Sequence, residues 1–169
     1  MSALILTVTL DSDLQAALDE LRRTYFPALR NFVPAHVTLF HNLPGQELAA
    51  VTATLQELAT ATKSFAVSLP TLTRLSNGLA LNVEAPPLLA LHAALAQRFA
   101  AWLTPQDRQA YKPHVTIMNK TTPQIALATY NQLATRWVGR AGMAVGLDLW
   151  HYRGGPWEKE RGLPFAPSA

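Results

Sequence analysis

The sequence predicts an α+β fold in which the strands pair mainly in antiparallel fashion. Segments with strand-like and helix-like periodicity alternate in a mixed order that includes a hairpin signal, and such an order is typical of α+β proteins. No glycine-rich phosphate loop of the Walker or dinucleotide type is present, so a doubly wound parallel sheet is not indicated. Hydrophobic residues make up 49% and charged residues 15% of the 169 positions. This composition supports a well-packed core, and we expect residues 1–169 to form a single domain.

The first half of the chain begins with a short, β-branched and apolar run, Leu4 to Leu10, which predicts a buried strand. Ser12 then starts a capping-box pattern that opens an amphipathic helix reaching Tyr25. Prolines follow this helix and lead into a strand around His36 to Phe40. After a Pro-Gly turn, the pattern predicts a second helix over Gln46 to Ala61.

The second half begins with a hairpin signal, because Asn77-Gly78 favours the primed turn that joins two antiparallel strands. Pro86-Pro87 then open a helix whose leucines form one apolar stripe, and Thr122 caps a further helix before Pro123. The expected segments are hairpin strands at Phe65–Leu75 and Leu79–Glu84, a helix to Leu103, a strand at His114–Met118, a helix to about Trp137, a strand at Gly142–Tyr152 and a final short strand or tail.

Composition also limits the classes of function. The chain has no cysteine, which excludes disulfides, thiolate zinc sites and cysteine nucleophiles and is compatible with the cytoplasmic location that we expect. No run approaches the ~20 apolar residues of a membrane span, and the first ten residues lack a basic leader. A formal charge of +3 and a pI near 9.5 suit a modest anionic ligand, but no block of lysine and arginine suggests a nucleic-acid coat protein.

The most informative feature is a weak internal repeat. Residues 33–39 and 112–117 each contain a proline, then His-Val-Thr and an aliphatic residue. Because side chains alternate between the two faces of a strand, His36 and Thr38 should share one face, as should His114 and Thr116. One His-x-Thr arises easily by chance, whereas two copies with matching flanks, one in each half, are difficult to obtain by chance. We therefore expect each segment to present an imidazole and a hydroxyl side by side.

This pair of segments suits the cleavage of a phosphodiester. A base that activates the attacking oxygen and an acid that protonates the leaving oxygen must lie on opposite sides of the phosphorus. Histidine can fill either role near neutral pH, since its ordinary pKa is about 6.5, and threonine hydroxyls can donate to the non-bridging oxygens. The assignment of base and acid to His36 and His114 stays open, because it depends on the direction in which the substrate binds.

Several other residues are candidates for contact with a substrate. Lysines flank the second segment and would add positive charge there, although both could equally be solvated. Apolar residues two positions after each threonine should wall the cleft on the histidine face, and aromatic residues near the C-terminus, including Trp157, could stack on a base or belong to the core. The candidates are Phe40, Lys112, Met118, Lys120, Trp150 and Tyr152.

The remaining histidines have ordinary interpretations. We expect His41 to be structural or exposed and His92 to lie at the surface or boundary of its helix. His151 is either a polar strand position or a residue that approaches the cleft. A zinc site needs three or four converging ligands, and the sequence has neither His-x-His nor His-x-x-x-His, so we predict no metal and no cofactor.

The segments His36-Val37-Thr38-Leu39 and His114-Val115-Thr116-Ile117 resemble the two signatures of the 2H phosphoesterase superfamily, in its 2′-5′ RNA ligase-like or RNA 2′,3′-cyclic phosphodiesterase branch. The resemblance extends more loosely over nearly the whole chain. It implies a bilobal fold with two largely antiparallel sheets, pseudo-two-fold symmetry around a central cleft and helices outside. It also implies that His36, Thr38, His114 and Thr116 are the catalytic set. Members often carry an arginine or lysine soon after the second signature, and only Lys120 lies near that place here.

The expected function is metal-independent hydrolysis of a 2′,3′-cyclic phosphate on RNA ends or small nucleotides, with the two histidines as general acid and base. Two alternatives fit the same residues. The same residues could carry out 2′-5′ RNA ligation, or the cleft could belong to a non-catalytic nucleotide- or RNA-binding module. In each case the expected partner is an RNA end or a small cyclic nucleotide, without a membrane or a metal, and we expect a monomer.

Overall fold

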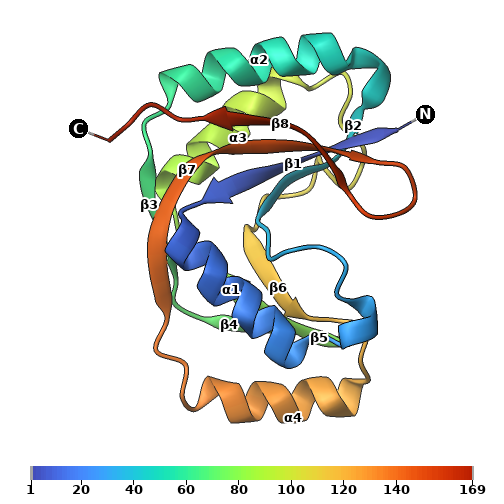
Figure 1. The fold of residues 1–169 in the computed structure, drawn as a ribbon, viewed down its shortest axis with the longest axis vertical. Coiled ribbons are helices and arrows are strands. Elements are labelled where there is room, and N and C mark those ends of the chain that lie inside the picture. The colour runs from blue at the N-terminus through green and yellow to red at the C-terminus, as the bar shows by residue number, and fades with distance from the viewer. Residues whose placement is uncertain (1, 169) are drawn as a thin grey trace.

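The computed structural model describes residues 2–168 and consists of two antiparallel sheets with helices around them (Figure 1). The larger sheet has the strand order β2-β1-β7-β3, with β8 also paired to β7, and the smaller sheet has the order β4-β5-β6. The larger sheet comprises β1 (Ala3–Leu10), β2 (Thr38–Pro44), β3 (Phe65–Leu69), β7 (Arg140–Tyr152) and β8 (Glu158–Pro164). The smaller sheet comprises β4 (Leu72–Leu75), β5 (Gly78–Asn82) and β6 (His114–Met118). The predicted α+β class with two antiparallel sheets is confirmed.

The long strand β7 organises the larger sheet. It pairs with β1 along one edge, while β3 and β8 pair with its first and second halves along the other edge. The chain leaves this sheet after β3, builds the β4–β5 hairpin, and later returns from the smaller sheet into β7. Each lobe is therefore built from segments that are not contiguous in the sequence. The buried apolar side chains of the two lobes form one contiguous cluster.

Helices cover the outer faces and one helix connects the lobes. The helix α1 contacts both β6 and β7, so it spans from one sheet to the other, whereas α2 and α3 lie beside the larger sheet and α4 lies under the smaller one (Figure 1). The four helices are α1 (Ser12–Tyr25), α2 (Leu48–Ala61), α3 (Pro86–Arg98) and α4 (Pro123–Ala134). No helix within residues 2–168 is long and apolar enough to cross a membrane.

Three sequence predictions need correction. The cap of α1 is Asp11 rather than Ser12, since the Asp11 carboxylate accepts from the backbone N–H of Leu14 at 2.9 Å, a role that aspartate fills as well as serine. The first motif strand begins at Thr38, so His36 precedes it. The expected long hairpin strand is divided at Pro70, which has no N–H to donate to a strand ladder: β3, before it, pairs in the larger sheet, and β4, after it, pairs in the smaller sheet.

Helix ends also differ from the predictions. The helix α3 ends at Arg98 rather than Leu103, and α4 ends at Ala134 rather than near Trp137. In both cases the apolar pattern continues past the helix, because Leu103 and Trp137 still pack against the core from the following loops. Thr122 is the N-cap of α4, as predicted, and its hydroxyl accepts from the Ile125 N–H at 3.2 Å.

Candidate active site

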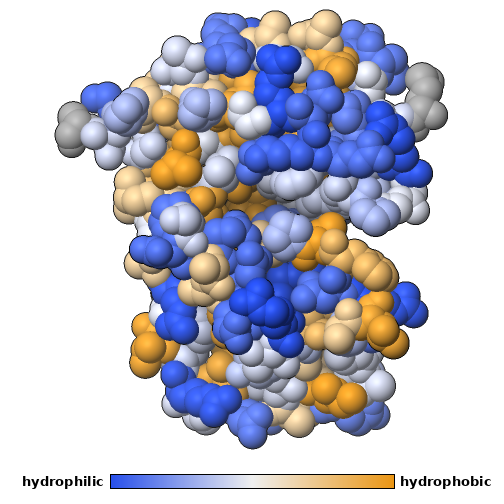
Figure 2. Space-filling model, in the orientation of Figure 1, coloured by the Kyte–Doolittle hydropathy of each residue, from blue (hydrophilic) through white to orange (hydrophobic). Residues whose placement is uncertain are grey.

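Both His-Val-Thr segments face the same cavity, which has a volume of about 400 Å³ and lies between the two sheets. His36 and Thr38 line it from β2 and the residues before it, and His114 and Thr116 line it from β6. The intervening Val37 and Val115 are buried, so each segment places its polar residues toward the cavity and its aliphatic residue in the core. In the space-filling view, a deep notch separates the two lobes (Figure 2).

The two imidazoles are held by the same hydrogen bond. Nδ1 of His36 lies 2.8 Å from the carbonyl oxygen of Pro34, and Nδ1 of His114 lies 2.8 Å from the carbonyl oxygen of Lys112. A carbonyl can only accept, so Nδ1 carries the proton in both rings, and Nε2 of each neutral ring keeps its lone pair. Each ring can therefore take up or release a proton at Nε2.

The two threonines are likewise held by equivalent contacts from distant parts of the chain. The Tyr111 hydroxyl donates to the carbonyl oxygen of Thr38 at 2.9 Å, and the Arg22 guanidinium donates to the carbonyl oxygen of Thr116 at 2.8 Å. Each donor satisfies a strand carbonyl and thereby fixes the strand segment that presents the hydroxyl. Tyr111 and Arg22 are positioning residues for the two motifs.

A matching irregularity follows each threonine. The β1–β2 register passes from Thr7↔Thr38 to Leu6↔Phe40, and the β5–β6 register passes from Ala80↔Thr116 to Leu79↔Met118. In each pair the motif strand therefore contains one extra residue after the threonine, which is a β-bulge. A bulge interrupts the alternation of faces, so the residue two positions after each threonine does not return to the cavity side.

This irregularity explains why two predicted cleft residues are not in the cleft. Phe40 and Met118 are both buried and line neither this cavity nor the one beside it, contrary to the prediction. The Phe40 ring instead stacks on His92 at 4.7 Å between ring centroids and meets Phe99 edge-on. Both side chains belong to the hydrophobic core.

The surroundings of His36 change its proton affinity. The pKa of His36 is lowered to about 4: burial is the largest cause, the positive charges of Arg22, His114 and His41 act in the same direction, and the hydrogen bond to the Pro34 carbonyl opposes them. The Trp157 ring contributes to the enclosure, with its centroid 4.7 Å from that of His36. His36 is therefore neutral at pH 7 and can accept a proton.

Arg22 is the main functional residue that the sequence prediction missed. Its side chain is only 3% exposed, its Nε donates to the Asn31 side chain at 3.0 Å, and its guanidinium lies over the Phe26 ring. Burial lowers the pKa of Arg22, and the nearby Asp19 carboxylate opposes this effect. Arg22 follows Leu18 by four residues on the apolar stripe of α1. A cation at an apolar-stripe position of an amphipathic helix is the feature of the sequence that could have identified Arg22 as a functional residue.

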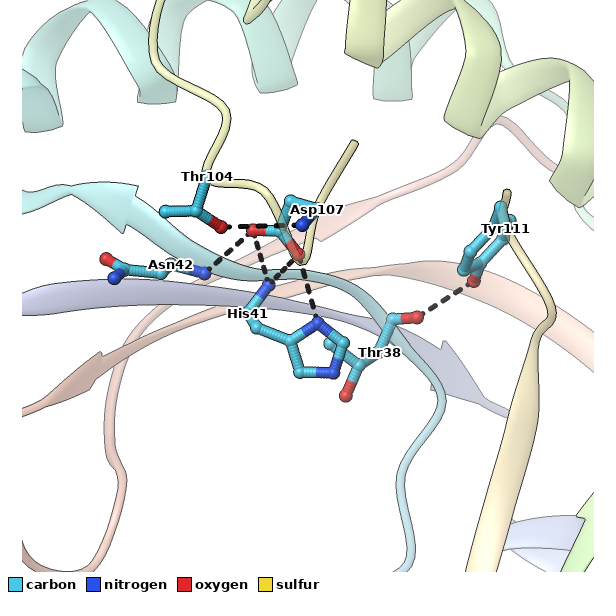
Figure 3. Close-up of polar contacts among 6 residues, drawn as sticks. All are labelled: Thr38, His41, Asn42, Thr104, Asp107 and Tyr111. Atoms are coloured by element: carbon cyan, nitrogen blue, oxygen red, sulfur yellow. Dashed lines mark hydrogen bonds and ion pairs between the residues drawn. The ribbon is translucent and has the colours of Figure 1, made fainter. Parts of the chain in front are cut away.

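His41 adds a third imidazole to the same cavity (Figure 3). Its Nδ1 lies 3.0 Å from the buried Asp107 carboxylate, which also accepts from the backbone N–H groups of His41 and Asn42. Burial raises the pKa of Asp107, but these hydrogen bonds outweigh it and the net pKa is lowered. The sequence predicted a structural or exposed His41, and its half-exposed ring is indeed anchored, yet it also faces the cavity. Asp107 was missed because the segment before His114 was predicted to be a plain connection.

The remaining predicted residues are divided between the cavity and its surroundings. Lys112 lines the cavity, whereas Lys120 is exposed and lines none of the three cavities that include His36. Trp150 donates from Nε1 to the Thr7 hydroxyl at 2.9 Å and lines a pocket of about 310 Å³ beside His36. Tyr152 lines a second cavity that adjoins the first. Trp157, which the sequence placed in the same aromatic cluster, is the member that touches His36.

The other two histidines occupy different settings. His92 is half-buried, lines the cavity and stacks on Tyr111 with ring centroids 3.9 Å apart. Burial is the main reason that its pKa is lowered. His151 lies away from this cavity, between the Ser2 hydroxyl at 3.1 Å and the Glu160 carboxylate at 2.9 Å. Within residues 2–168, no three histidine, aspartate or glutamate side chains are grouped so that they could hold a metal ion.

A two-lobed α+β fold that brings a duplicated His-Val-Thr segment to one cavity defines the 2H phosphoesterase class of proteins. The family profile of the 2′-5′ RNA ligase superfamily matches residues 10–156, which include both segments. The chain therefore belongs to this superfamily, and membership supports a phosphoesterase or ligase-like activity. No curated protein sequence gives a significant match.

Solved structures share the fold over nearly the full length of the chain. TT0787 of Thermus thermophilus superposes with a TM-score of 0.71 at 19% identity and covers 100% of both chains. E. coli LigT complexed with 3′-AMP gives a TM-score of 0.65 at 13% identity over 98% of both chains. Usb1 of Kluyveromyces marxianus gives 0.52 at 16% identity over 97% of both chains. At these identities the similarity shows the common architecture.

Proposed function

We propose that this protein is a phosphodiesterase that opens 2′,3′-cyclic phosphates on RNA ends or small nucleotides without a metal ion. The observation that carries the proposal is the shared cavity of His36 and His114, in which each ring keeps Nε2 for proton transfer while Nδ1 is engaged. The E. coli LigT structures with bound 3′-AMP and with bound phosphate are similar to this chain and support a nucleotide phosphate as the ligand.

The proposed reaction needs one proton acceptor and one proton donor. A water oxygen attacks the phosphorus while Nε2 of one histidine takes its proton, and the bond from phosphorus to one ribose oxygen breaks as the other histidine protonates that oxygen. His36 fits the acceptor role because its lowered pKa keeps it neutral at pH 7. His114 is then the donor. The Thr38 and Thr116 hydroxyls donate to the non-bridging oxygens, where negative charge increases in the transition state, and Lys112 supplies positive charge at the rim.

A substrate panel tests the proposal. Wild type, His36→Ala and His114→Ala are assayed with 2′,3′-cyclic nucleotides, an oligoribonucleotide with a cyclic phosphate end and ADP-ribose 1″,2″-cyclic phosphate, each with and without EDTA. We expect wild-type turnover that survives EDTA and a loss of about 100-fold or more in either variant, since a positioned acid or base contributes about 10²–10⁴. Turnover that is lost with EDTA and restored by added metal would contradict the metal-independent mechanism.

The same panel separates the two alternatives. RNA fragments with a 2′,3′-cyclic end and a free 5′-hydroxyl report 2′-5′ ligation, which uses the same proton transfers with a ribose hydroxyl as the nucleophile in place of water. A binding module without catalysis would retain 3′-AMP in wild type and show no turnover of any member of the panel. Correct folding of each variant is checked by circular dichroism.

A further inference from the structure

A second cavity of about 520 Å³ opens directly beside the catalytic one. His36, Thr116 and Trp157 line both cavities and form the boundary between them. A ligand that places a phosphate between the two histidines therefore has a neighbouring space that begins at the same side chains. The volume lies within the range of about 300–1,000 Å³ that is typical of ligand sites.

The charge of this second cavity is positive. Arg22 and Arg30 line it, and its described lining contains no aspartate or glutamate. Arg22 is buried in its wall; among the described residues the Asp19 carboxylate lies near enough to oppose the lowering of its pKa, but no salt bridge joins them. The guanidinium uses Nε and one terminal nitrogen for Asn31 and Thr116, so the other terminal nitrogen is the group that remains for an anion, as arginine commonly provides for phosphate.

The rim of the cavity carries two aromatic side chains that are unusually exposed. Phe32 is 70% exposed and follows the short 3-10 helix Ala28–Arg30, while Tyr152 is 43% exposed at the end of β7. Apolar surface is visible at the lower lip of the notch (Figure 2). Exposed aromatic rings beside a positively charged groove are the combination that binds single-stranded nucleic acid, where bases stack and phosphates meet cations.

We infer that the second cavity binds the nucleotide that precedes the cyclic end of an RNA chain. Arg22 and Arg30 contact the phosphate that joins the two nucleotides, and Phe32 or Tyr152 stacks on the preceding base. The substrate class is then an RNA 3′ end of at least two nucleotides rather than a free mononucleotide. This inference rests on the proposed function, because it assumes that the cyclic phosphate occupies the first cavity.

The test compares kcat/KM for 2′,3′-cyclic AMP and for ApA with a 2′,3′-cyclic phosphate end. Wild type should prefer the dinucleotide at least fivefold, since stacking and a phosphate contact are added. Phe32→Ala and Arg30→Ala should each lower kcat/KM for the dinucleotide at least threefold more than for the mononucleotide. Leu29→Ala is the matched control for Phe32→Ala, because Leu29 is 88% exposed in the same segment and lines neither cavity. Arg74→Ala, an exposed change on β4, is the control for Arg30→Ala.

Binding measured by calorimetry keeps the inference separate from catalysis. ApA 3′-phosphate should bind wild type at least fivefold more tightly than 3′-AMP, and Phe32→Ala and Arg30→Ala should reduce that difference. Equal binding of the two ligands, or an equal loss for both ligands in the variants, would overturn the second nucleotide site. Preferential binding of the dinucleotide without turnover of either cyclic substrate would support the site and overturn the proposed hydrolysis.

Discussion

The two His-Val-Thr segments are alike in local geometry although they lie in unequal sheets of five and three strands. In both, the imidazole Nδ1 is bonded to the carbonyl two residues earlier at 2.8 Å, and the threonine carbonyl accepts from a distant side chain. In both, a bulge follows the threonine. The likeness is therefore confined to the few residues that present groups to the cavity, and the rest of each lobe is free to differ.

The segments differ in what surrounds them. His36 precedes its strand and is half-buried beside Trp157 and Arg22, whereas His114 is the first residue of β6 and is exposed. Burial, together with the positive charges of Arg22, His114 and His41, lowers the pKa of His36 to about 4. Equivalent positions can thus serve unequal roles in proton transfer, because the proton affinity of an imidazole is decided by burial and nearby charge.

The largest expected effect comes from replacing the two histidines, and it tests whether both act in one catalytic step. His36→Ala and His114→Ala should each lower kcat on a cyclic phosphate by about 100-fold or more. The double variant should lose little beyond the more severe single variant, because residues that act in one step are strongly non-additive. Steady-state rates at saturating substrate measure this. A double variant whose loss equals the product of the single losses would show that the histidines contribute independently.

A smaller effect is expected from the contact that holds the second segment. Arg22→Met should lower the free energy of unfolding by about 1–3 kcal/mol, because the Thr116 carbonyl and the Asn31 side chain lose a buried donor. It should also raise the pKa of His36, since the Arg22 charge helps to lower it. Urea unfolding and NMR titration of the His36 ring measure the two changes.

Tyr111→Phe is the matched change at the first segment. It removes the hydroxyl that donates to the Thr38 carbonyl and should cost about 0.5–1.5 kcal/mol, the range for a single neutral hydrogen bond. Tyr111 is not among the residues whose charge shifts the pKa of His36. A rise in the pKa of His36 in Tyr111→Phe equal to that in Arg22→Met would contradict the charge explanation.

The pH dependence of stability gives a further test of how the surroundings of His36 differ from those of His114. The pKa of His36 is about 4 in the folded protein and about 6.5 in an unfolded chain. Between these values the unfolded state binds more protons, so the contribution of His36 to stability is complete above pH 6.5 and is lost as the pH falls toward 4. Urea midpoints at pH 7.5 and 4.5 should therefore differ less in His36→Asn than in wild type. An equal difference in both proteins would show that His36 does not account for the loss.

Periodicity in the sequence was sufficient for most of the fold. The apolar stripe of α1, the Asn77-Gly78 hairpin and the Thr122 cap are local features, and the structure has all three. The alternation of faces also placed His36 with Thr38 and His114 with Thr116 on the cavity side. The same rule failed for Phe40 and Met118, because it assumes an uninterrupted strand and each strand bulges after its threonine.

The sequence alone determined that the protein has no thiol and that two repeated segments each carry one imidazole and one hydroxyl. Tertiary structure decided which distant groups support them. Arg22 meets Thr116 across 94 residues, Tyr111 meets Thr38 across 73, and Asp107 meets the His41 ring across 66. Such contacts depend on how the two sheets and α1 pack together rather than on any local propensity. Burial of a cation or a carboxylate, and the resulting change in proton affinity, arises only when the chain has closed around it.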